Sequence, residues 1–107
     1  MEAIPKTLKF YETDDDKAPF RDWLNDYDGQ KVFGIILARL KKVEKGLMGD
    51  CEPVGSGVHE LKIDFGPGFR LYFGCDGTDV VLLWGGIKRT QPQDIKTAIK
   101  FWEDYNA

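Results

Sequence analysis

The sequence has 107 residues and a formal net charge of −3, and its length is that of one small domain. Hydrophobic residues make up 42% of the chain and charged residues 31%, so the composition supports a packed core and excludes a wholly disordered chain. The excess of acidic over basic residues is unusual for a protein that binds nucleic acid, so such binding would need a local basic patch. We expect a single globular domain over residues 1–107.

The content of cysteine, histidine and apolar runs predicts a cytoplasmic protein. The longest apolar run, Val80–Trp84, is far shorter than the roughly 20 residues that cross a bilayer. Cys51 and Cys75 are too few for a disulfide scaffold, and one histidine does not support a zinc site. The first residues form no basic, apolar leader. We therefore expect reduced thiols, no metal and no association with a membrane.

The first half of the chain predicts one strand and two helices. A strand is expected at Leu8–Glu12, and the acidic residues that follow it favour the N-terminus of a helix. This helix should begin near Lys17 or Ala18 and end at Gly29. It carries apolar residues at helical spacing, namely Phe20, Trp23, Leu24 and Tyr27. A second helix is predicted over residues 30–45, with Gly46 after its last turn.

The second half predicts three strands and a last helix. Residues 47–57 are expected to form a loop, because Gly, Pro and Asp are frequent there. Apolar and polar residues then alternate over Val58–Phe65, and again from Phe69 onward after the turn at residues 66–68. Asp76-Gly77 is typical of a hairpin, and Val80–Trp84 is apolar on both faces, as in a central strand. A final helix is capped by Thr90 or Gln91, with Pro92 in its first turn.

This order of elements predicts an α+β domain with its helices packed on one face of an antiparallel sheet. The other face would then carry polar side chains, among them Lys62, Arg70 and Tyr72, and Lys88 and Arg89 follow the third strand. Clustered Arg and Lys side chains suit a polyanion, because they bind phosphate oxygens. The alternative is the ordinary solvated face of a half-buried sheet.

His59 is the only histidine and Ser56 the only serine, but the sequence around them does not form the Gly-x-Ser-x-Gly turn of a hydrolase. His59 is a candidate general acid or base, because the pKa of a histidine is ordinarily close to neutral. The alternative is a surface histidine at the start of a strand.

The segment HELKIDFGPGFRLYF, residues 59–73, resembles the bacterial RelE/ParE toxin superfamily. The segment LLWGGIKRTQPQDI, residues 82–95, is similar to the HigB-type addiction module killer proteins, as are FRDWL and ARLKKVEKG upstream. The likeness extends from about Phe20 to Trp102.

The resemblance implies the RelE/ParE-like fold and a toxin of a type II toxin-antitoxin pair, an mRNA interferase that cleaves translated mRNA on the ribosome as an endoribonuclease. In the implied reaction the RNA 2′-OH attacks the adjacent phosphate, with proton transfer and cationic stabilisation but no metal or other cofactor. The family's cation positions fall on Lys62, Arg70 and Arg89, or on Lys88 beside Arg89. The implied partners are a cognate antitoxin, often a helix-turn-helix protein, together with the ribosome and mRNA.

The chain departs from the family pattern at two places. The family's C-terminal catalytic Tyr or His has no counterpart, because residues 93–95 are Gln, Asp and Ile, and Asp64 stands where other members have a basic residue. We take Tyr72 and His59 as the substitute candidates for proton transfer. Two other functions stay open: a ParE-like toxin that inhibits DNA gyrase without cleaving RNA, and a non-toxic homologue that only binds its antitoxin.

The antitoxin is expected to cover a groove formed by Trp84, Tyr72 and the basic face. An acidic, amphipathic segment would suit such a groove, bound as a helix or as an added strand.

Overall fold

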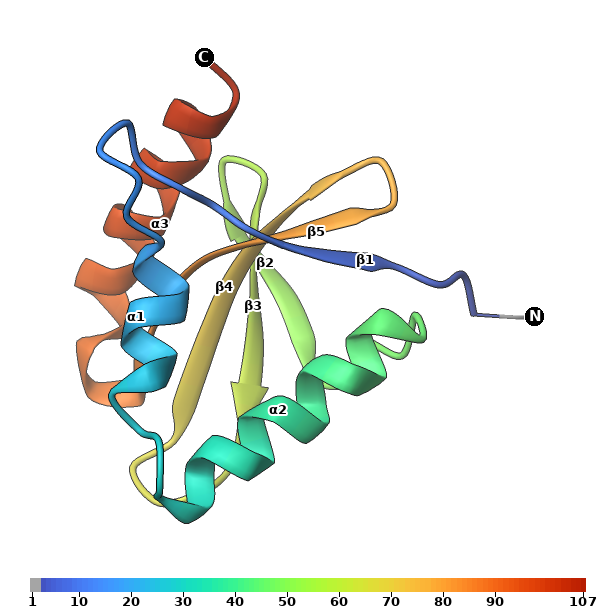
Figure 1. Ribbon diagram of the computed structural model, residues 1–107, viewed down its shortest axis with the longest axis vertical. Helices are drawn as coiled ribbons and strands as arrows, with labels where there is room; N and C mark the ends of the chain where they lie inside the picture. Colours follow the sequence, from blue (N-terminus) through green and yellow to red (C-terminus); the bar gives the residue numbers. More distant parts are fainter. Residues whose placement is uncertain (1–2) are drawn as a thin grey trace.

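The computed structural model of the chain describes residues 3–107 and has a mixed α+β fold with a five-stranded sheet and three α-helices (Figure 1). In chain order the elements are β1 (Thr7–Phe10), α1 (Pro19–Asn25), α2 (Lys31–Glu44), β2 (Cys51–Gly55), β3 (Val58–Ile63), β4 (Phe69–Asp76), β5 (Asp79–Ile87), the 3₁₀ turn η1 (Lys88–Thr90) and α3 (Gln91–Tyr105). Within residues 3–107, the helices are too short or too polar to cross a membrane.

The sheet has the strand order β1-β5-β4-β3-β2. The N-terminal strand β1 pairs in parallel with β5, and the other neighbours are antiparallel. Because β5 lies between β1 and β4, its first half is covered on both edges, and Val80–Leu83 are fully buried. The prediction of a central strand at this position is confirmed.

The prediction of a loop over residues 47–57 is wrong in part, because β2 forms there as the outer strand of the sheet. Cys51 pairs with Leu61 of β3, and the pairing shifts between Pro53 and Gly55. Proline is tolerated in an edge strand, because its missing N–H leaves no unmade bond on the outer side. The Gly and Pro content of this segment indicated turns. It did not indicate a strand, because composition alone does not show that the segment lies at the edge of a sheet, where these residues are tolerated.

The ends of two strands also differ from the predicted ones. β3 ends at Ile63 instead of Phe65, because the backbone bonds of the following turn start there: Phe65 N donates to Ile63 O and Gly68 N to Phe65 O. Gly68 has a φ of 80°, a conformation that favours glycine. β5 continues past Trp84 to Ile87.

The expectation that all helices pack on one face of the sheet is wrong. α1 and α2 cover one face, where Phe20, Ile36 and Leu40 meet Leu61 and other apolar residues of β3, β4 and β5. α3 packs on the opposite face, where Ala98 lies in a second buried cluster with residues of β3, β4 and β5. A strand that is apolar on both faces needs a cover on each, and α3 provides the second cover over Val81 and Leu83 of β5.

Close packing of α3 depends on a glycine of β4. A Cβ atom at Gly74 would lie 2.5 Å from the ring of Trp102, so only glycine lets this indole rest on the strand. Tyr11, just beyond β1, donates a hydrogen bond of 2.6 Å from its hydroxyl to Asp104 of α3. As a result, α3 covers much of the sheet face that was expected to be open.

Candidate functional site

Three of the predicted cations gather at the end of the sheet where β4 begins and β5 ends. Lys62 of β3 lies directly opposite Arg70 of β4. A Cβ atom at Gly68 would lie 3.5 Å from Nη1 of Arg70 and 3.3 Å from Cβ of Lys88, so both residues border this glycine. The backbone N–H of Lys88 donates to Gly68 O at 2.9 Å, which joins η1 to the turn before β4. Arg89 follows in the same turn and is exposed.

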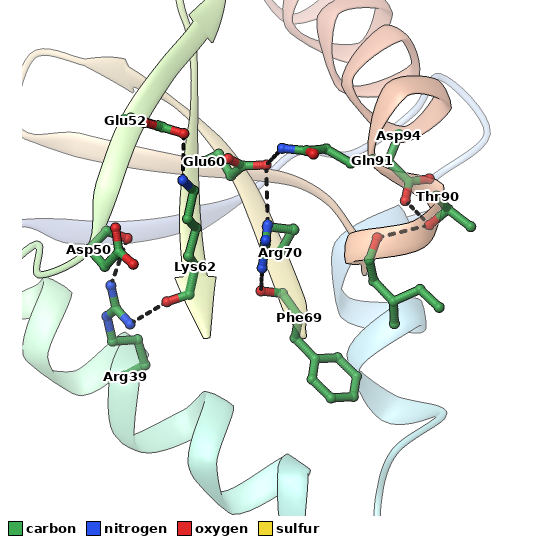
Figure 2. A network of polar contacts seen from close by, with 11 residues as sticks. Arg39, Asp50, Glu52, Glu60, Lys62, Phe69, Arg70, Thr90, Gln91 and Asp94 are labelled. Atoms are coloured by element: carbon green, nitrogen blue, oxygen red, sulfur yellow. Dashed lines mark hydrogen bonds and ion pairs between the residues drawn. The ribbon is translucent and has the colours of Figure 1, made fainter. Parts of the chain in front are cut away.

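Lys62 is bound by a carboxylate of the edge strand. Its Nζ lies 2.6 Å from Oε1 of Glu52, and its side chain is 30% exposed (Figure 2). Hydrogen bonding to Glu52 and the negative charge of that residue raise the pKa of Lys62, so its amine stays protonated at neutral pH. Lys62 is therefore a cation at this site and not a base.

α2 holds the backbone of the same corner. Nη1 of Arg39 donates to Lys62 O at 2.8 Å, and its Nη2 donates to Asp50 O at 3.0 Å (Figure 2). One guanidinium thus ties α2 to the end of β3 and to the residue just before β2. Because the fork of an arginine is planar and rigid, these bonds fix Lys62 relative to Glu52.

Arg70 is mostly covered and interacts with a buried carboxylate. It is 9% exposed, its Nε lies 3.6 Å from Oε1 of Glu60, and its Nη1 donates to the carbonyl of Phe69 at 3.2 Å (Figure 2). Glu60 is fully buried and accepts a hydrogen bond of 2.6 Å from Nε2 of Gln91. Its second oxygen, Oε2, has no hydrogen-bond partner in the described part of the chain. Burying an ionised carboxylate is costly unless it is paired, so Glu60, Arg70 and Gln91 depend on one another.

Tyr72 is not on an open surface, contrary to the expectation. It is fully buried beneath α3, and within residues 3–107 its hydroxyl has no hydrogen-bond partner. Burial, followed by the negative charges of Glu60 and Asp94, raises the pKa of Tyr72 far above its ordinary value of 10.0. The phenol is therefore neutral at neutral pH and is not exposed to a substrate at the surface.

His59 lies on the other face of the sheet from Lys62 and Arg70. Successive side chains of a strand alternate between faces, and His59 stacks on Phe73 of the α1–α2 core at a centroid distance of 5.4 Å. The structure therefore brings together Lys62, Arg70 and Lys88, with Arg89 next to Lys88 in η1, but not His59.

Asp94 of α3 holds η1 in place. Its Oδ2 accepts a hydrogen bond of 2.5 Å from Oγ1 of Thr90, and its Oδ1 accepts one of 3.0 Å from Nε1 of Trp84. A Cβ atom at Gly86 would clash with the same carboxylate, so glycine is required where Asp94 crosses β5. These contacts set the position from which Lys88 and Arg89 project.

Comparison with known proteins identifies a relative of this chain. No family model matches the chain. A Haemophilus influenzae protein described only as an uncharacterized protein is 41% identical over 80 residues, which is 74% of this chain and 81% of that protein. The two proteins belong to one family. Membership places the chain beside a relative of similar length but carries no activity with it.

Sequence reasoning missed several residues that shape the cation cluster. These are Glu52, Gly86, Gln91 and Asp94. The pair Gly85-Gly86 within a strand was the available signal, since interior glycines mark close approach of another group. No pattern in the sequence links Gln91 to a glutamate 31 residues earlier.

Proposed function

We propose that this protein is the toxin of a type II toxin-antitoxin pair, with the RelE/ParE-like fold, and that it cleaves mRNA on the ribosome as an endoribonuclease. The observation that supports this proposal best is that Arg70 and Lys88 border Gly68 and that Lys62 lies opposite Arg70 on the neighbouring strand. Arg89 follows Lys88 in the turn η1. The resemblance of residues 59–73 and 82–95 to the RelE/ParE and HigB-type proteins supports RNA as the polyanion, because Lys62, Arg70, Lys88 and Arg89 by themselves suit any phosphate chain.

The residues of the cluster suit charge stabilisation in phosphate cleavage. The attack of a 2′-OH on the adjacent phosphate builds negative charge on the phosphoryl oxygens, and fixed cations lower the free energy of that state. Lys62 is a protonated amine, and Arg70 is held rigidly with little exposure. Lys88 and Arg89 are exposed and would bind the flanking phosphates.

Glu52 is the proton acceptor that best fits this geometry. It is exposed on the outer strand and lies 2.6 Å from Lys62, whereas Tyr72 is buried and His59 is on the other face. In the proposed step the 2′-oxygen forms a bond to phosphorus and its proton passes to Glu52. The bond from phosphorus to the 5′-oxygen breaks, and the leaving oxygen takes a proton from Lys62. The products are a 2′,3′-cyclic phosphate and a 5′-hydroxyl.

A second function is favoured by the positions of Tyr72 and His59. With both residues away from the cations, the same surface could bind a macromolecule without cleaving RNA, as a ParE-like inhibitor of DNA gyrase does. The cations would then contact the enzyme or its DNA, and no proton transfer would be needed.

Induction of the wild-type protein in bacteria separates the two functions. We expect growth arrest, cleavage of translated mRNA detected by primer extension, and unchanged DNA supercoiling. Arrest with intact mRNA and broken or abnormally supercoiled DNA would support the gyrase function and contradict the endoribonuclease. Normal growth with unchanged mRNA and DNA would contradict both toxic functions.

A further inference from the structure

A groove between α1 and α3 lies outside the cation cluster. It consists of two adjoining hollows with volumes of about 440 and about 270 Å³. Trp23 of α1 and Trp84 of β5 line both hollows and so make them one continuous surface. The larger hollow is also bordered by Pro19, Phe101 and two aspartates, Asp22 of α1 and Asp26, which directly follows α1.

The aromatic walls are held rigidly in place. A Cβ atom at Gly85 would lie 2.3 Å from the ring of Trp23, so the indole packs flat against a strand without a side chain. Trp84 is held by its hydrogen bond of 3.0 Å to Asp94 and packs edge-on to Phe101 at a centroid distance of 6.0 Å. Both indoles are half-buried, so each offers part of its surface to a ligand without reorganisation.

The rim of the groove is acidic. Asp22 and Asp26 are exposed and lie four residues apart. Asp26 directly follows α1 and has helical dihedral angles, so both carboxylates lie on the same side of the helix. Asp22 has one ionic contact, with Arg21 at 3.7 Å, and no ion pair to Asp26 occurs within residues 3–107. Among residues 3–107, Lys17 is the one basic residue that lines the larger hollow. The negative charge is therefore in excess where the aromatic surface is accessible.

We propose that this groove docks a segment of a partner protein by binding an arginine side chain of that segment. A guanidinium stacks on indole faces, pairs with carboxylates through two parallel hydrogen bonds, and carries an apolar stem that suits Pro19 and Phe101. An acidic segment, which the sequence suggested for a groove at Trp84 and Tyr72, does not suit this rim. Tyr72 is buried and takes no part in it.

Lysine is a weaker fit than arginine. Its ammonium group is compact and strongly hydrated, whereas the planar guanidinium can stack on Trp23 or Trp84 while it pairs with Asp22 or Asp26. This inference does not rest on the proposed nuclease. The groove is not lined by the cations proposed to bind RNA, namely Lys62, Arg70, Lys88 and Arg89.

The test uses three blocked tripeptides with leucine on either side of arginine, citrulline or glutamate, together with free arginine. Indole N–H resonances of the full chain are followed during titration. The arginine tripeptide should shift the signals of Trp23 and Trp84 with saturation and leave Trp102 unchanged. The citrulline tripeptide, which keeps the shape but lacks the charge, should bind at least about tenfold more weakly.

Two double variants test whether the carboxylates at the rim of the groove bind the arginine tripeptide. Asp22→Asn/Asp26→Asn should weaken binding of the arginine tripeptide by at least about tenfold, whereas Glu44→Gln/Asp64→Asn, which removes two exposed charges elsewhere, should not. Equal binding of the arginine and citrulline tripeptides, or no saturation, would overturn the proposal. If free arginine binds as tightly as the tripeptide, the groove is a site for a small molecule and the docking proposal is wrong.

Discussion

Gln91, the first residue of α3, donates a hydrogen bond of 2.6 Å to the buried carboxylate of Glu60 in β3. This contact joins the last helix to the strand that carries Lys62. We expect Gln91→Ala to lower the free energy of unfolding by about 1–3 kcal/mol, because it removes a partner of a buried charged group. Urea unfolding measures the change.

Gln93→Ala is the control for Gln91→Ala, since Gln93 is exposed on the same helix. Its effect should stay within about 0.5 kcal/mol. Equal losses in the two variants would show that the side-chain bond to Glu60 is not the cause.

The pairing of Glu60 with Arg70 predicts a coupling that a double-mutant cycle can measure. Glu60→Leu leaves Arg70 mostly buried without its carboxylate, which should cost about 3–5 kcal/mol of unfolding free energy. Adding Arg70→Met should recover a large part of that loss, because no buried charge then remains. Glu52→Gln, at the exposed pair with Lys62, should cost less than about 1 kcal/mol. Additive losses at Glu60 and Arg70 would contradict the pairing.

The raised pKa of Tyr72 predicts a loss of stability in alkaline solution. The folded state retains the phenolic proton, so this contribution is complete below the unfolded pKa of about 10 and declines as the pH rises above it. Between about pH 8 and about pH 11, Tyr72→Phe should lose less unfolding free energy than the wild type. Urea unfolding at both pH values measures the difference. The pKa of Tyr11 is also raised, so Tyr11 contributes to the pH dependence of stability in both the wild type and Tyr72→Phe. An identical pH dependence with and without the phenol would show that Tyr72 titrates normally.

Two glycine substitutions should change the stability of the fold in opposite directions. Gly86→Ala places a methyl group against the Asp94 carboxylate and should destabilise the fold by about 1–3 kcal/mol. Gly34→Ala in the exposed part of α2 meets no atom within 4 Å and should stabilise it by about 0.4–1 kcal/mol. Thermal unfolding measures both, and a neutral Gly86→Ala would show that Asp94 can move away.

The pattern of apolar residues in the sequence predicted the three helices, β1 and the three antiparallel strands β3, β4 and β5. The helices and β3 have one apolar face that is buried, whereas β5 is apolar on both faces. It did not predict β2, since Pro53 and Gly55 are typical of turns and become compatible with a strand only at a sheet edge. It also did not place α3. Hydrophobic periodicity shows that a helix has an apolar face, but not which face of the sheet receives it.

For the candidate site, the sequence predicted the cations but not their surroundings. Lys62 and Arg70 alternate with core residues, so the pleat of a strand places them on one face. The same argument places Tyr72 with them, and only the position of α3 shows that it is buried. It also separates His59 from them, because an odd position in β3 faces the α1–α2 core. Contacts such as Glu60 with Gln91 depend on how distant elements pack, which local patterns do not encode.

Primer extension on an mRNA that is translated in a purified bacterial system tests most directly whether the cation cluster of Lys62, Arg70, Lys88 and Arg89 acts on RNA. The variant Lys88→Ala/Arg89→Ala removes two exposed cations of η1, and Lys41→Ala/Lys42→Ala removes two exposed cations of α2 as the matched control. We predict cleavage by the wild type and the control, and a loss of at least about a hundredfold in the rate for the η1 variant, because fixed charges at the reacting phosphate are lost. Cleavage by the η1 variant at the wild-type rate would contradict the assignment of this surface to RNA.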